Sequence, residues 1–177
     1  MSPESPLLYR QPVETPLGTM TALASEQGIV LFEFAEGAHL ERGVRDLLRH
    51  LPPAVEIRDE SHPHLDRLRR EISEYFAGTR TRFDVPLHLL GTPFQLQVWS
   101  ALLQIPYGRT CSYAEEAAMI GRPAAVRAVA NANGRNRMPI LVPCHRVIGS
   151  DGSLTGYSAG IQRKIRLLEL ERKSSAE

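Results

Sequence analysis

A thiol and an imidazole are neighbours in the segment Pro143-Cys144-His145-Arg146, and this segment is the best candidate in the chain for nucleophilic chemistry. A cysteine attacks as its thiolate, and an unperturbed thiol with a pKa of about 8.5 is only a few per cent ionised at neutral pH. A base must therefore take the proton from Cys144. Because neighbouring side chains in an extended segment point to opposite faces, we expect His145 to reach the thiol through a bridging water.

A histidine that acts as a base needs a partner that orients its ring, and this partner is usually a carboxylate. Glu171 is the candidate, because it lies near the end of a predicted helix. The apolar stripe of that helix contains Ile161, Ile165 and Leu168, and Glu171 borders it. Spacing alone favours a solvated helix end for Glu171. For Cys144 it leaves two interpretations open, a nucleophile or a small buried hydrophobic residue.

Two short helices separated by a tight turn are predicted before the cysteine. Residues 112–115 have the capping-box pattern that begins a helix, Gly121 ends it, and Pro123 begins a second helix over residues 122–132. The layout is that of a helix-turn-helix or of a plain helical hairpin. The second helix carries small side chains and one long cation, Arg127. A helix that lies in a DNA groove and inserts one side chain among the bases needs this combination, which favours the helix-turn-helix.

The first half of the chain carries strand patterns followed by helix patterns. Residues 17–24 and 28–34 predict two strands joined by a polar turn, and residues 55–58 predict a short third strand. Apolar residues recur at helical spacing from Leu40 to Leu48 and again from Leu65 to Phe76. We therefore expect an α+β domain over residues 1–85 and a linker over 86–91. A mostly helical domain over 92–177 begins with a capping box at Thr92.

The composition is that of a globular protein, with 177 residues, 42% of them hydrophobic and 23% charged. Residues 1–16 and 173–177 are expected to fray. No apolar run reaches the roughly 18 residues of a membrane span and no secretory pattern begins the chain, so we expect a cytoplasmic protein. The net charge is +1, but six arginines and only two acids lie between Arg109 and Arg146. His62 and His64 have ligand-like spacing that no further residue completes, which predicts no metal site.

Many residues of the second half resemble one family, the O6-alkylguanine-DNA alkyltransferases, also called methylated-DNA–protein-cysteine methyltransferases. The resemblance runs from about Tyr75 to Glu171, and before that it is one of layout only. Its motifs in chain order are Phe94-Gln95, Val98-Trp99, Ile105-Pro106-Tyr107-Gly108, Ser112-Tyr113, Arg127-Ala128-Val129, Asn136, Pro143-Cys144-His145-Arg146-Val147-Ile148 and Gly156-Tyr157.

The resemblance implies an α+β fold with a small ribonuclease H-like N-terminal domain and a helix-turn-helix in the C-terminal domain. It implies DNA repair by base flipping, with stoichiometric and irreversible transfer of an alkyl group from O6-alkylguanine in double-stranded DNA to the protein's own cysteine. O4-alkylthymine stays open as a second substrate. The expected partner is damaged duplex DNA, bound by a monomer, with cooperative binding left open. No cofactor, metal or membrane is expected.

The resemblance also assigns roles to catalytic residues. Cys144 is the alkyl acceptor, His145 the water-mediated base and Glu171 the acid that orients His145. Asn136 braces the site. Tyr113 assists rotation of the nucleotide and donates a proton towards N3 of the guanine.

Further residues are assigned to DNA and to the guanine. Arg127 fills the gap that the flipped base leaves in the duplex, which offsets part of the cost of flipping. The other DNA contacts implied are Ala125, Ser112 and Arg122. The pocket for the base is implied to contain Tyr157, Ser158, Val147 and Ala159.

Three positions depart from the family pattern. Ala159 stands before Gly160 where a glycine pair is common, which predicts a slightly narrower pocket entry. Arg137 stands where proline is common, and either loosens the turn or contacts a phosphate. Cys111 is not a motif cysteine, and we expect it to be structural.

Three other functions compete with repair. A lesion sensor that resembles the alkyltransferase-like proteins would lack the acceptor cysteine, which Cys144 argues against. A thiol hydrolase or acyltransferase using Cys144, His145 and Glu171 would give Arg127 no role. A transcriptional regulator would need a further module.

Overall fold

The computed structural model describes residues 5–175, which form two compact units divided between Gly91 and Thr92. The chain is an α+β protein, as predicted. Within the described part of the chain, no helix is long and apolar enough to cross a membrane.

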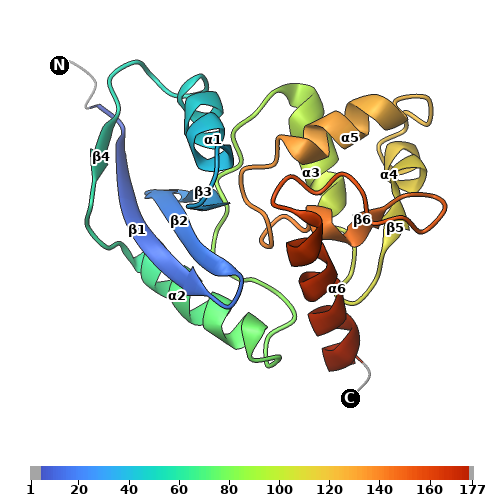
Figure 1. The fold of residues 1–177 in the computed structure, drawn as a ribbon. Coiled ribbons are helices and arrows are strands. Elements are labelled where there is room, and N and C mark those ends of the chain that lie inside the picture. The colour runs from blue at the N-terminus through green and yellow to red at the C-terminus, as the bar shows by residue number, and fades with distance from the viewer. Residues whose placement is uncertain (1–4, 176–177) are drawn as a thin grey trace. The chain divides into compact units, whose positions relative to one another are not determined.

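The first unit is built on a four-stranded sheet of order β3-β2-β1-β4 (Figure 1). Strands β1 (Leu7–Thr15), β2 (Gly18–Ser25) and β3 (Gly28–Phe34) pair antiparallel. The chain then passes through helix α1 (His39–Leu48) to β4 (Glu56–Arg58), which pairs parallel with β1, and continues into helix α2 (Pro63–Phe76).

Strand β1 corrects the prediction that residues 1–16 fray. Leu7–Thr15 lies inside the sheet and pairs with a neighbour on each side, whereas residues 1–4 lie outside the described residues. Pro6, Pro12 and Pro16 hide the strand pattern in the sequence. The strand forms because pairing with β2 and β4 supplies hydrogen bonds that no local signal shows.

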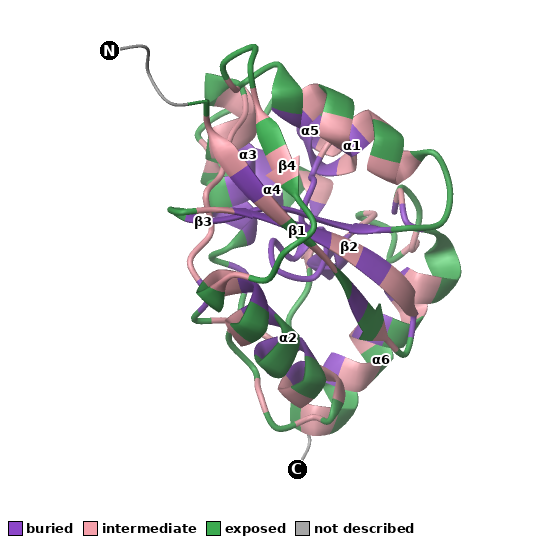
Figure 2. Cartoon of the chain, turned by 90° about the vertical axis from the view of Figure 1, so that its left-hand side faces the viewer, coloured by how far each residue is buried: buried purple, intermediate pink, exposed green. Residues whose placement is uncertain are grey.

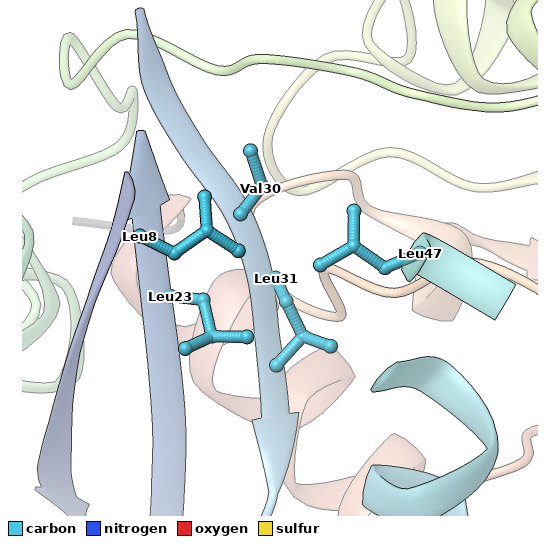
Figure 3. Close-up of a cluster of buried hydrophobic side chains, with 5 residues drawn as sticks. All are labelled: Leu8, Leu23, Val30, Leu31 and Leu47. Carbon is cyan, nitrogen blue, oxygen red and sulfur yellow. The ribbon is translucent and has the colours of Figure 1, made fainter. Parts of the chain in front are cut away.

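One part of the core of this unit lies between the sheet and α1, and another is formed by the buried residues of α2. Leu8, Leu23 and Leu31 come from three adjacent strands and gather with Leu47 of α1, all at most 1% exposed (Figure 3). Helix α2 packs against β1, β2 and β3 and buries one stripe while its other side is exposed (Figure 2). At roughly 25 cal/mol per Å² of buried apolar area, such contacts supply most of the stabilisation of a small domain.

The segment assigned to a linker is partly integrated into the first unit. The amide of Ile29 donates to the carbonyl of Pro86 at 2.9 Å, and the amide of His88 donates to the carbonyl of Ile29 at 2.8 Å. Residues 86–88 thus extend the sheet beyond β3. Gly28 has to be glycine here, because its φ is +150° and a Cβ would lie 2.5 Å from the oxygen of Pro86.

The second unit is mostly helical. Its helices are α3 (Pro93–Leu102), α4 (Tyr113–Met119), α5 (Val126–Gly134) and α6 (Ile161–Ser175), and its only paired strands among the described residues are β5 (Cys111–Ser112) and β6 (Val147–Ile148). Complete capping boxes begin α3 at Thr92 and α4 at Ser112, as predicted. Helix α4 packs against α3 and α5.

Three local predictions in this unit are wrong. Helix α5 begins at Val126 rather than at residue 122, because residues 122–125 form a separate turn closed by the Ala125 amide and the Arg122 carbonyl at 2.9 Å. The N-cap residue of α5 is Ala125, and it makes no side-chain capping hydrogen bond. Cys144–Arg146 is a 3-10 turn, η1, rather than extended. Helix α6 reaches Ser175, so residues 173–175 do not fray, whereas 176–177 lie outside the described residues.

Candidate active site

The short parallel pair β5–β6 brings distant parts of the chain together. Cys111 is opposite Val147 and Ser112 is opposite Ile148. Tyr113 begins helix α4 directly after β5, and the turn that carries Cys144 ends where β6 begins. The register therefore places the start of the helix pair next to the cysteine segment.

Asn136 holds the cysteine from one side. Its Nδ2 donates to Cys144 Sγ at 3.3 Å and to the carbonyl of Val142 at 2.8 Å, while its Oδ1 accepts from the amide of Met138 at 2.9 Å. Cys144 is buried but keeps 8% of its surface exposed. An N–H donor directed at sulfur stabilises negative charge there, as a nucleophilic thiolate requires.

The backbone before the cysteine is strained. Ile140 has a φ of +77°, in the left-handed region that β-branched residues rarely adopt, and its side chain is buried. Such residues persist only where the surrounding structure holds them, and they gather at functional sites.

His145 and Glu171 form a buried pair. His145 Nε2 is hydrogen-bonded to Glu171 Oε2, and the two side chains are 0% and 1% exposed. Burial lowers the pKa of His145 more than Glu171 raises it. Burial alone would raise the pKa of Glu171, but its hydrogen bonds and charge interactions with His145 and Arg146 lower it to about 2. The pair is therefore a neutral imidazole donating from Nε2 to a carboxylate.

That assignment determines what the other ring nitrogen can do. With the proton on Nε2, Nδ1 of His145 carries a lone pair, and it is buried without a hydrogen-bond partner among residues 5–175. A lone pair in this position can accept a proton. The prediction from spacing that Glu171 is a solvated helix end is wrong, because the buried stripe of α6 consists of Lys164, Leu167 and Glu171 rather than Ile161, Ile165 and Leu168.

Arg146 fixes the second oxygen of the carboxylate, a role that the sequence analysis missed. Its Nε donates to Glu171 Oε1 at 2.7 Å and its Nη1 donates to the carbonyl of Ile105 at 2.8 Å. The guanidinium lies 5.7 Å from the centre of the Tyr107 ring, and the amide of Gly108 also donates to Glu171 Oε1 at 3.3 Å. The motif of residues 105–108 thus supports the carboxylate. The motif of residues 105–108 was visible in the sequence, but the sequence did not show that Arg146 and Glu171 are its partners.

Lys164 is a second residue next to the candidate site that was not predicted from the sequence. It is fully buried, and its Nζ donates to the carbonyls of Val147 at 2.6 Å and Thr155 at 3.3 Å. The Tyr113 hydroxyl donates to the same Thr155 carbonyl at 3.1 Å, and Nζ lies 5.9 Å from the Tyr113 ring centre. Lys164 therefore ties β6 to the loop that follows it. Its position seven residues before Glu171, on the same helical face, was the available signal.

The residues expected to line a base pocket lie in that loop and strand. Val147, Tyr157 and Ala159 are 0%, 7% and 8% exposed, and Ser158 is partly exposed. Burial raises the pKa of Tyr113, and the charges of Cys144 and Glu116 raise it further, so its hydroxyl keeps its proton at neutral pH.

The outer face of α5 carries small residues and Arg127. A shallow hollow on it is lined by Ala124, Ala125, Arg127, Ala128 and Asn131. Arg127 is exposed, while Val129, Ala132 and Asn133 face inwards. The exposed Arg122 lies 5.6 Å from the centre of the Phe94 ring.

The surroundings of three further residues bear on the roles that were expected for them from the sequence. Ser112 is 8% exposed and its Oγ accepts from the Glu115 amide, so it caps α4. Arg137 is buried 5.2 Å over the Trp99 ring, which contradicts a phosphate contact. Burial of Cys111 raises its pKa to about 11, with Glu116 and Glu115 adding to the effect, so it is a poor nucleophile.

Comparison with known proteins identifies the family. Residues 8–89 match the model of "6-O-methylguanine DNA methyltransferase, ribonuclease-like domain", and residues 93–173 match that of "6-O-methylguanine DNA methyltransferase, DNA binding domain". The constitutive methylated-DNA–protein-cysteine methyltransferase of Bacillus subtilis (strain 168) is 42% identical over 171 residues, which cover 96% of this chain and 98% of that protein. The chain belongs to the 6-O-methylguanine DNA methyltransferase family.

Other members of the 6-O-methylguanine DNA methyltransferase family are similar over different spans. The methylated-DNA–protein-cysteine methyltransferase of Mycobacterium tuberculosis (strain ATCC 25618 / H37Rv) is 61% identical over 102 residues, which cover 58% of this chain and 62% of that protein. The crystal structure of Mycobacterium tuberculosis OGT in complex with DNA is 40% identical, with a TM-score of 0.76 and coverage of 95% of this chain and 94% of that chain.

Family membership confirms the resemblance and extends it to the first unit, where the sequence showed only a similar layout. In this member of the 6-O-methylguanine DNA methyltransferase family, the structure brings together Asn136, Cys144, His145 and Glu171. Arg127 and Ala125 line the hollow on the outer face of α5, and Arg122 is exposed next to Phe94. The roles of the individual residues stay predictions.

Proposed function

We propose that this protein repairs DNA by transferring an alkyl group from O6 of guanine in duplex DNA to Cys144, once per molecule. The observation that carries the proposal is the buried pair in which His145 donates from Nε2 to Glu171 and keeps Nδ1 as an acceptor. Family membership supports the substrate class, because relatives are named for methylated DNA and one is described in complex with DNA.

The proposed reaction begins with activation of the thiol. The Cys144 proton passes through a bridging water to Nδ1 of His145, and Glu171 stabilises the imidazolium that forms. Asn136 Nδ2 donates to the sulfur as charge develops. This explains why an imidazole next to the cysteine in sequence needs no direct contact with it.

The sulfur then attacks the alkyl carbon, and the carbon–O6 bond breaks. Its electron pair moves into the guanine ring, where Tyr113 donates a proton at N3. Tyr113 is left as a phenolate, and it regains a proton through water from the imidazolium of His145. The proton that leaves the thiol therefore equals the one that guanine gains. The product is a thioether, whose carbon–sulfur bond is not hydrolysed by water, so each protein molecule reacts once.

The exposed face of α5 is proposed to lie against the duplex. Its small residues allow close approach, and Arg127 is the side chain long enough to occupy the position of a flipped nucleotide. We propose that the protein acts as a monomer in the cytoplasm, where its two thiols stay reduced.

Peptide mass spectrometry tests this function. After incubation with a duplex containing O6-methylguanine, the peptide with Cys144 should gain the mass of one methylene group, and the peptide with Cys111 should not. An undamaged duplex and the variant Cys144→Ser serve as controls, and the variant should still bind DNA. An unchanged Cys144 peptide would show that the protein is not a transferase.

A further inference from the structure

A buried carboxyl group between helices α4 and α5 has no part in the reaction above. Glu116 of α4 is 0% exposed, and Asn133 of α5 is 5% exposed. Asn133 Nδ2 donates to Glu116 Oε2 at 2.7 Å. In the described part of the chain, burial and the Asn133 hydrogen bond are the influences on the pKa of Glu116, and no cation is among them.

One carboxyl oxygen of Glu116 and the amide oxygen of Asn133 lack hydrogen-bond donors among the described residues. Glu116 Oε1 and Asn133 Oδ1 are both buried and have no hydrogen-bond partner within residues 5–175. An ionised carboxylate only accepts, and burying it with a single hydrogen bond costs several kcal/mol. A neutral carboxylic acid offers one donor, and the amide oxygen of Asn133 is an acceptor that lacks a donor. Because the two groups already share the Nδ2–Oε2 hydrogen bond, one proton placed between the remaining oxygens would satisfy both.

We propose that Glu116 is a positioning residue that is protonated in the folded protein up to about neutral pH and then forms a ring of two hydrogen bonds with Asn133. In this ring Asn133 Nδ2 donates to one carboxyl oxygen, and the protonated oxygen donates back to Asn133 Oδ1. The ring fastens the C-terminal turn of α5 to α4, which lie side by side in Figure 1.

The surroundings of Glu116 favour the neutral form. Titratable groups near it are Cys111 on β5 and Tyr113 and Glu115 on α4 itself, and none of them is a cation. Helix α5 contributes the exposed Arg127 with Arg135 at its end, while α3 and β6 carry no titratable side chain. Burial raises the pKa of Glu116 to about 7, although the Asn133 hydrogen bond opposes the shift.

The ring is connected to the acceptor cysteine through the end of α5. The amide of Asn136 donates to the carbonyl of Asn133 at 3.1 Å, and Asn136 Nδ2 donates to Cys144 Sγ. Trp99 Nε1 donates a hydrogen bond to the carbonyl of Ala132, the residue before Asn133, at 3.0 Å. Loss of the proton at Glu116 removes one hydrogen bond and places two acceptors together, which loosens the turn that carries Asn136. This effect on transfer depends on the proposed function.

The variant Glu116→Gln tests the proposal, because glutamine makes the same two hydrogen bonds without a titratable proton. We expect its transfer rate from an O6-methylguanine duplex to equal that of the wild type at about pH 6, with the wild type falling behind it as the pH rises past about 7. The melting temperature of the wild type should fall relative to that of the variant between about pH 4.5 and 7 and then stay level, because the folded state binds this proton more tightly than the unfolded chain. Glu115→Gln is the matched control, because it removes a neighbouring exposed charge and retains the cap. Identical pH profiles for wild type and Glu116→Gln would overturn the proposal.

A measurement on the wild type alone avoids dependence on the folding of the variant. With ¹³C-labelled glutamate, one side-chain carboxyl carbon should titrate near pH 7 in the folded protein. If every glutamate titrates in the ordinary acidic range, Glu116 is ionised and the proposal fails. This readout needs no DNA, so it separates failure of the ring from failure of the proposed function, in which no variant would take up a methyl group at any pH.

Discussion

Replacement of Glu171 by glutamine should change how the protein responds to acid. The folded pKa of about 2 lies below the ordinary value of 4.5, so the folded state binds the proton less tightly than the unfolded chain. The carboxylate therefore contributes stability above pH 4.5, and this stability is lost as the pH falls towards 2. A gap of this size corresponds to about 3 kcal/mol, because each pH unit is worth about 1.4 kcal/mol. Glu171 is 1% exposed, so solvent screening reduces this figure little.

The assay is urea unfolding of the wild type and of Glu171→Gln at several pH values between about 7 and 3. The variant should be less stable at neutral pH, because Arg146 and His145 lose their charged partner. Its free energy of unfolding should then fall less steeply than that of the wild type as acid is added. Glu169→Gln, an exposed change on the same helix, is the matched control.

Parallel loss of stability in the wild type and in Glu171→Gln would refute this account, because Glu171 could then not be the ionised member of the pair. His145 contributes in the opposite direction. Its pKa falls further in Glu171→Gln because the carboxylate no longer raises it, so acid below the ordinary value of 6.5 destabilises the variant through His145 more than the wild type. The comparison is therefore repeated in a His145→Gln background, which removes this contribution from both proteins.

Three further predictions concern single side chains. Arg127→Ala should slow transfer from duplex DNA roughly tenfold or more while leaving transfer from the free base unchanged; equal rates on the duplex in wild type and variant would contradict a role in base flipping. Lys164→Met removes the Lys164 hydrogen bond to the Val147 carbonyl, while the Thr155 carbonyl keeps the Tyr113 hydroxyl as a donor, and should lower the free energy of unfolding in urea by about 1–3 kcal/mol; an unchanged midpoint would rule out this structural role of Lys164. Asn136→Asp replaces the donor at Sγ by an acceptor and should slow alkylation of Cys144 by iodoacetamide about tenfold or more; wild-type kinetics would exclude that hydrogen bond from activation.

Features that depend on neighbouring residues could be predicted from the sequence. The capping boxes at Thr92 and Ser112 are formed between residues three positions apart, so the pattern contains both partners. Strand Gly28–Phe34 was predicted with its observed bounds because its apolar residues are interrupted only by Glu33. Strand Leu7–Thr15 was missed because its partners lie elsewhere in the chain.

The candidate site shows the same division. Cys144 and His145 stand out because a thiol beside an imidazole is visible in the sequence itself. The burial of Glu171 was not predictable, because helical spacing identifies a face but not what that face packs against. Arg146 and Lys164 were missed for a related reason. Their partners are carbonyls and carboxylates far away in the chain, and only the fold brings them within hydrogen-bonding distance.

The pairing of β5 with β6 has a consequence for how such proteins can change. The segment from Tyr113 to the turn at Cys144 lies between strands β5 and β6, and the two residue pairs of these strands hold its ends together. Substitutions on the outer side of that segment leave this pairing untouched. Residues on the exposed face of this segment can therefore change, and with them the preference for nucleic acid, while the position of Cys144 in the fold stays the same.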